Sequence, residues 1–276
     1  MTSFALKLVL CLSVLIGNMG LVLVDGEKYT LVYQLMRMVG AMAVPIACFL
    51  LVEGFHHTSS KKTYFIRLFF CGVIAELPYL GCSLMGLRKL VLELEECIGK
   101  ETMPNYDSMK QLAEIKKDGT MPYFTDLYNT TAKYAVDGLI ALSFMLLVLM
   151  LIDRLREKYA QENKTKFTVL SSLTLLGALV MIVVIPFESP LPILFFTAVF
   201  YFLRGNKAGI AVMSVLLISF FYMDAGMIIT LGPIMGVLIC FAYNGKQGEK
   251  GFNKFFYIMY PLQYMLIWGT NYFVLK

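Results

Sequence analysis

Long apolar runs are the feature that most limits what this chain of 276 residues can fold into. A helix needs about 20 apolar residues to cross the hydrocarbon core of a bilayer, because each residue adds about 1.5 Å to its length. Nine runs approach that length, at residues 4–24, 31–52, 65–86, 134–152, 168–187, 190–203, 208–223, 226–243 and 255–275. The sequence therefore predicts an all-α, polytopic integral membrane bundle of about nine transmembrane helices, forming a single domain over residues 1–276.

The composition excludes several other classes of protein. Hydrophobic residues make up 58% of the chain and charged residues only 16%, whereas a soluble domain has about 25% charged residues. The net charge of +5 resides in loops between the apolar runs, and no basic stripe with interleaved aromatic residues is present. We therefore expect the lipid bilayer to be a partner of this protein and nucleic acid not to be one.

Basic residues are distributed unevenly among the connections between the predicted helices. If the N-terminus is cytoplasmic, the inside loops hold Lys61, Lys62, Arg67, Arg154, Arg156, Lys158, Lys164, Lys166, Arg204, Lys207, Lys246, Lys250 and Lys254. The short outside connections contain one basic residue, Lys28. The positive-inside rule then predicts a cytoplasmic N-terminus, an outside C-terminus and a multi-pass protein of the cell membrane, typically the bacterial cytoplasmic membrane.

One sizeable polar segment interrupts the apolar pattern, at residues 87–133 on the predicted outer side. Its first part places apolar residues at helical spacing with glutamates between them, as in an amphipathic surface helix. Two interpretations stay open, a solvated lid and a platform that binds a partner. Cys82 and Cys97 lie near this segment and could form a disulfide with each other. The six cysteines include no CxxC motif, so the sequence predicts no metal site.

A carboxylate and a histidine lie one helical turn apart at the predicted cytoplasmic end of the second run. Glu53 and His57 are four residues apart, so a continuous helix would place them on one face. A carboxylate that orients an imidazole is the arrangement that general-base catalysis needs. The alternative is an interfacial pair that anchors the helix end beside Lys61 and Lys62.

Charged residues inside membrane helices are costly and tend to mark functional or paired positions. Glu76 lies in the third run, just before Pro78, and Arg37 lies in the second. We expect Arg37 to be the partner of Glu76, because an unpaired charge at that depth would be expensive. Such a pair would either join two helices or bind a substrate.

These residues also carry a family resemblance. Seven segments resemble the TraX family and follow one another in the same order as in that family. They are Arg37–Gly40, Ala43–Ile46, Phe49–Thr58, Lys62–Leu68 and Ala75–Tyr79, and near the C-terminus Tyr243–Lys246 and Phe256–Leu262. The resemblance covers roughly residues 4–86 and 190–275.

The resemblance implies a membrane-embedded acyltransferase, because the family is named for a conjugation protein that acetylates pilin. Acetyl-CoA or another acyl-CoA would be the donor, and a peptide, a pilin-like protein or a cell-envelope polymer the acceptor. His57 or Glu53 would be catalytic, and the donor phosphates would bind to Lys61, Lys62 and Arg67. Substrate-binding residues are expected at Arg37, Glu76, Asn18 and Gln263.

Three positions depart from the family pattern. Asn18 follows Gly17 where relatives have an Asp-His pair, Ala41 replaces an Arg, and Gln263 replaces a His. Neither Asn nor Gln can act as a general base near neutral pH, although both can hydrogen-bond a substrate. A second hypothesis therefore stands beside the transferase, a catalytically inactive TraX-like scaffold that binds a partner through its outer loop.

Overall fold

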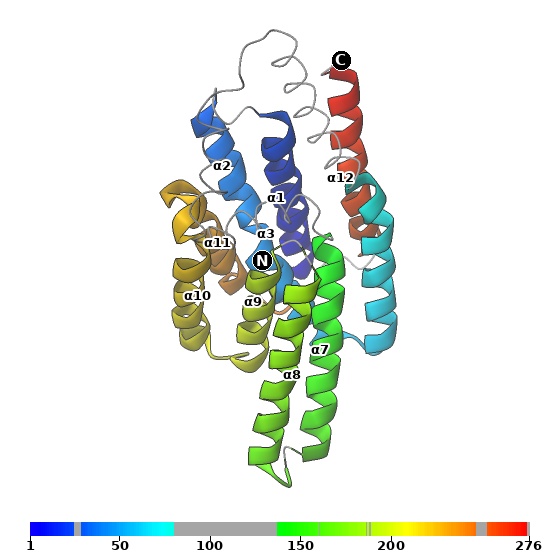
Figure 1. Ribbon diagram of the computed structural model, residues 1–276, viewed down its shortest axis with the longest axis vertical. Helices are drawn as coiled ribbons and strands as arrows, with labels where there is room; N and C mark the ends of the chain where they lie inside the picture. Colours follow the sequence, from blue (N-terminus) through cyan, green and yellow to red (C-terminus); the bar gives the residue numbers. More distant parts are fainter. Residues whose placement is uncertain are drawn as a thin grey trace, which may run out of the picture.

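The computed structural model describes residues 1–24, 29–79, 137–159, 161–185, 187, 189–246 and 253–274, and these residues fold almost entirely into helices (Figure 1). The helices are α1 Ser3–Leu23, α2 Thr30–Ala41, α3 Ala43–His57, a helix over residues 61–79, α7 Gly138–Tyr159, α8 Lys164–Val184, α9 Pro190–Phe202, α10 Lys207–Tyr222, η1 Met223–Ala225, α11 Met227–Phe241 and α12 Asn253–Val274. The predicted all-α membrane bundle is confirmed. The outer segment 87–133 and the pairing of Cys82 with Cys97 lie outside the described residues.

Each of the nine predicted runs coincides with helical structure over the residues that the structure describes. By length and hydropathy, four stretches could cross a membrane, namely Ser3–Gly20, Thr30–His57, Gly138–Tyr159 and Lys164–Ile182. The shorter apolar helices are Pro190–Phe202, Lys207–Tyr222, Met227–Phe241 and Phe255–Ile267. The number of spans and their orientation in the membrane stay predictions.

The second run is interrupted at Met42, where α2 ends and α3 begins. Pro45 lies within the first turn of α3 and has no N–H to donate to the carbonyl of Ala41, so the continuous hydrogen-bond ladder cannot pass this point. The N–H of Met42 instead bonds back to Val39. One predicted span is therefore two helices joined by a break near the middle.

Two helix boundaries differ from the prediction. We expected spans 134–152 and 168–187, but α7 continues to Tyr159 and α8 already begins at Lys164. Asn163 caps α8, because its side chain accepts a hydrogen bond from the N–H of Lys166 at 2.9 Å. Hydropathy marks where apolar residues stop, whereas a capped polar helix can extend beyond that point. In Figure 1 this α7–α8 hairpin extends below the other helices.

Glycines allow α2 to pack closely between α1 and α11. The backbones of α1 and α2 meet at Gly17 and Gly40, where an added Cβ would lie 2.5 Å from the opposite Cα. On the other side, Gly232 and Gly236 of α11 form a small-xxx-small pair against the carbonyls of Met38 and Met42. These contacts fix the position of α2, and through it that of α3.

The largest hydrophobic core surrounds α9. This helix is apolar on all sides, and residues from α3 and α7 pack around it, including Phe55 and Leu146. Such a helix avoids lipid because its neighbours cover it, which explains how a run of only 13 residues forms a stable element. The packing brings the C-terminal ends of α3 and α9 together, and the candidate site forms there.

Candidate functional site

The predicted contact between Glu53 and His57 is confirmed. His57 Nε2 lies 3.2 Å from Glu53 Oε2, on one face of α3. The Glu53 side chain is only 14% exposed, whereas that of His57 is 45% exposed. The carboxylate is thus held inside the protein while the imidazole can still meet a substrate.

Arg204 completes this pair from a distant part of the sequence. It follows the end of α9, and its Nε donates to Glu53 Oε1 at 3.0 Å. Both oxygens of the carboxylate therefore have a partner. The sequence placed Arg204 among the inside-loop cations but gave no reason to join it to Glu53, because only the packing of α9 on α3 brings them together.

Tyr243 borders the same cluster from the residues that follow α11. Its ring packs edge-on against Phe49 of α3, with ring centroids 5.5 Å apart. Tyr243 also lies near enough to Glu53 and Arg204 for their charges to act on its phenol.

The neighbouring His56 has a different environment from His57. Its ring stacks on Tyr201 of α9, with centroids 5.6 Å apart and planes only 10° from parallel. Its Nε2 is buried and has no hydrogen-bond partner among the residues described. The two adjacent histidines therefore divide into a packing residue and an accessible one.

The ammonium group of Lys61 is already part of an ion pair within the protein. Its ammonium pairs with Asp153 of α7 and lies 4.5 Å from the centroid of the Phe55 ring. The sequence did not single out Asp153, which is separated from Lys61 by 92 residues. Of the three predicted donor-binding residues, Lys62 and Arg67 are exposed and Lys61 is held in this contact.

A pocket of about 290 Å³ opens where α3 gives way to the next helix. It is lined by Thr58, Ser59, Ser60, Thr63, Tyr64 and Arg67. Ser60 caps the helix over residues 61–79, because its hydroxyl accepts from the N–H of Thr63 at 3.3 Å. The pocket therefore combines hydroxyl groups, a guanidinium and a helix N-terminus, a set that suits an anion. Thr58 follows His57 directly, so pocket and imidazole are adjacent.

The predicted pair of Arg37 with Glu76 is wrong. The ion pairs among the described residues do not join them. Arg37 lies on α2, which packs on α1 and α11, whereas the helix that carries Glu76 packs on α7 through Gly72 and on α12 through Cys71. The two helices occupy different sides of the bundle (Figure 1), so the charges do not meet.

Glu76 instead belongs to a second polar cluster, formed with α7 and α12. Its Oε2 accepts from the backbone N–H of Asp137 at 3.0 Å. The fully buried Asp137 accepts from the Tyr260 hydroxyl at 2.5 Å. Glu76 lies 15 residues beyond Lys61 on one helix, about 22 Å along its axis. Glu76 and the Glu53–His57 pair thus belong to two separate polar clusters.

Asn18 and Gln263, which replace histidines common in relatives, both have an amide nitrogen buried without a hydrogen-bond partner in the described part of the chain. Asn18 lies 15 residues into α1, about 22 Å along that helix from Ser3. Gln263 is only 3% exposed, on α12. Ala41, the third departure, packs beside Gly232, where an added Cβ would lie 3.0 Å from its own. The roles of these three residues stay predictions.

These features define a polytopic helical membrane protein with a polar cluster at one end. Residues 5–92 match the family model described as TraX protein, so the predicted resemblance to the TraX family is confirmed over this part of the chain. The matched region contains Arg37, Glu53, His57 and Glu76, whereas the C-terminal part of the resemblance stays a prediction.

One curated relative is the probable fimbrial assembly protein FimC, serogroup H1, of Dichelobacter nodosus. It is 33% identical over 75 residues, which are 27% of this chain and 30% of that protein. The chain thus matches less than a third of the length of this relative. No solved structure matches the chain.

Proposed function

We propose that this protein is a membrane-embedded acyltransferase that moves an acyl group from acyl-CoA to an amine or hydroxyl of a pilin-like or other cell-envelope acceptor. The observation that carries the proposal is the Glu53–His57–Arg204 arrangement beside the pocket that contains Arg67. The name of the fimbrial relative and the TraX match support a pilin-like acceptor.

The side chains present suit the donor. The pocket offers hydroxyl donors and the Arg67 guanidinium for a phosphate, and Lys62 is exposed next to it. The predicted cytoplasmic loops lie at this end of the bundle, where cytosolic acyl-CoA would arrive. His57 directly precedes Thr58 of this pocket and has a ring nitrogen that can accept a proton.

The proposed reaction needs one proton acceptor. With its Nε2–H donated to Glu53, His57 would keep Nδ1 free as the base. The acceptor amine or hydroxyl would attack the thioester carbonyl and lose its proton to Nδ1. A new bond to nitrogen or oxygen would form, the carbon–sulfur bond would break, and the proton would pass to the departing thiolate. Arg204 would hold the carboxylate of Glu53 in the correct orientation.

Release of free CoA thiol by the purified full-length protein tests this proposal. Acetyl-CoA is supplied with and without a peptide that has a free N-terminal amine. We expect His57→Gln, which keeps a hydrogen-bonding group but no base, to lower turnover by about 10²-fold or more. Arg67→Gln should raise KM for acetyl-CoA while changing kcat less. Lys207→Gln, an exposed cation at the same end, is the matched control and should behave as wild type.

Two outcomes would overturn the proposal or its mechanism. Full turnover in His57→Gln would remove His57 from the reaction. A wild-type protein that releases no thiol, and whose unfolding temperature is the same with and without CoA, would contradict donor binding and favour the inactive scaffold.

A further inference from the structure

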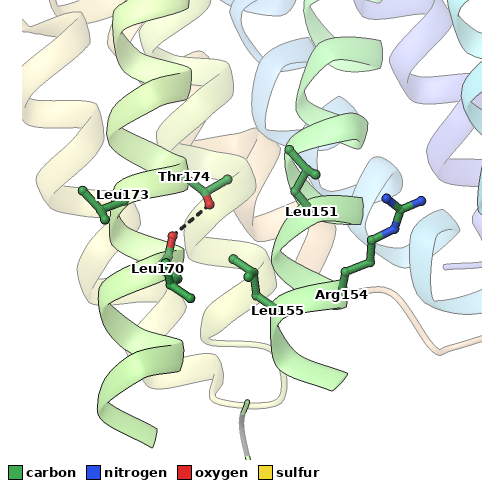
Figure 2. Close-up of a pocket in the computed structure, with 6 residues that line it drawn as sticks. All are labelled: Leu151, Arg154, Leu155, Leu170, Leu173 and Thr174. Carbon is green, nitrogen blue, oxygen red and sulfur yellow. Dashed lines mark hydrogen bonds between the residues drawn. The ribbon is translucent and has the colours of Figure 1, made fainter. Parts of the chain in front are cut away.

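The α7–α8 hairpin holds a second pocket that the proposed reaction does not use. It has a volume of about 480 Å³ and is lined by Leu151, Arg154, Leu155, Leu170, Leu173 and Thr174. Figure 2 shows Leu151 and Leu155 on the side of α7 that faces the α8 residues, whereas the Arg154 side chain extends from the other side of α7. The pocket is therefore a groove between the two helices of the hairpin.

The lining of the groove is almost wholly apolar. Thr174 is its only hydroxyl, and that hydroxyl already donates to the carbonyl of Leu170 at 2.8 Å within α8. Four of the six lining residues are leucines, of which Leu151 and Leu173 are about half exposed. The walls belong to two of the stretches that are long and apolar enough to cross a membrane. An apolar occupant fits the groove and a polar one does not.

Cationic side chains beside the groove identify the class of occupant. Arg154 is exposed, and no ion pair to it occurs among the residues that the structure describes. The same hairpin carries Arg156, Lys158, Lys164 and Lys166, while Asp153 is already paired with Lys61. Lys158 and Lys166 lie over the ring of Tyr159, at 5.2 and 4.7 Å from its centroid. A tyrosine flanked by lysines is typical of the membrane–water interface.

We infer that this groove binds one anionic phospholipid, with an acyl chain between α7 and α8 and its phosphate-bearing headgroup at Arg154. Basic pockets between membrane helices on the cytoplasmic side hold anionic headgroups in this way. A neutral lipid would fill the same groove but would gain nothing from the cations. The site is independent of the Glu53–His57 cluster, so it stands whether or not the protein transfers acyl groups.

Native mass spectrometry of the full-length protein in a neutral detergent tests the inference. Dioleoyl-phosphatidylglycerol and dioleoyl-phosphatidylcholine have the same chains and differ in headgroup charge, and glycerol phosphate supplies the headgroup without chains. We expect one tightly bound phosphatidylglycerol, weaker binding of phosphatidylcholine and no binding of glycerol phosphate. Arg154→Gln should weaken phosphatidylglycerol binding about fivefold and leave phosphatidylcholine unchanged.

Two further variants distinguish lipid binding in the groove from nonspecific electrostatic attraction to the basic end of the protein. Thr174→Phe fills the groove and should weaken both lipids. Lys207→Gln removes a cation at the same end outside the groove and should leave both affinities unchanged. Equal binding of the two lipids by the wild type, retained preference in Arg154→Gln, or an equal loss in Lys207→Gln would each overturn the inference. Binding of glycerol phosphate alone at similar affinity would also overturn it, because the chain would then contribute nothing.

Discussion

The close packing of α11 on α2 predicts that a single methyl group at Gly232 destabilises the protein. A Cβ at this position would lie 2.1 Å from the carbonyl oxygen of Met38, whereas real Cβ contacts essentially never fall below 3.0 Å. The two helices would have to separate by about 0.9 Å, the difference between these distances. The atom in the way is backbone, so no side-chain rotation can relieve the contact. Overpacking of this kind costs about 1–3 kcal/mol.

The chain offers a matched control for this substitution. Gly177 lies in the middle of α8 and has no atom within 4 Å of the position a Cβ would take. Gly177→Ala adds the same methyl group to a helix without a clash, and the better helix propensity of alanine should stabilise it by up to about 1 kcal/mol. The pair therefore separates the effect of the contact from the effect of the residue type.

Reversible unfolding in mixed micelles with increasing denaturing detergent measures both variants against wild type. Gly232→Ala should unfold at a lower detergent fraction, and Gly177→Ala at an equal or higher one. Because α2 continues into α3, Gly232→Ala should also disturb the Glu53–His57 end of α3. Wild-type stability in Gly232→Ala would refute the packing of α11 on α2.

Two further predictions concern the polar clusters. Arg204→Gln should lower kcat for acetyl-CoA turnover with little change in KM. Arg204→Lys should recover part of the lost kcat, because a lysine can still neutralise the charge of Glu53. An equal loss of kcat in both variants would mean that Arg204 acts only by packing. Tyr260→Phe removes the hydroxyl that donates to the buried Asp137 and should cost about 1–2 kcal/mol of unfolding free energy. The same unfolding assay checks this second effect, and an unchanged transition would show that Asp137 does not depend on Tyr260.

Local sequence patterns were sufficient to predict part of the candidate site. The contact between Glu53 and His57 follows from their spacing, because residues four apart on a helix share a face whatever the rest of the fold does. The positions of the helices followed equally well from the apolar runs, since the cost of exposing backbone to lipid leaves the helix as the solution within each run. The helix ends were less predictable, as the polar extensions of α7 and α8 show.

Contacts between distant residues had no such local signal. Arg37 was expected to neutralise Glu76 because both are charges in adjacent runs, yet their helices pack against different neighbours. Arg204 and Asp153 became partners of Glu53 and Lys61 only because α9 and α7 pack on α3.

The sequence by itself determined that the chain is a bundle of apolar helices, where most of those helices lie, and that one helical turn brings Glu53 and His57 into contact. The tertiary structure decided which helices are neighbours, and hence which charges are paired, where Arg204 enters the site, and that Glu76 belongs to a separate cluster. The physical reason is that helix formation and the spacing along a helix are set within a few residues, whereas helix neighbours are set by close contacts, such as those at Gly17, Gly40 and Gly232, between parts of the chain that the sequence holds far apart.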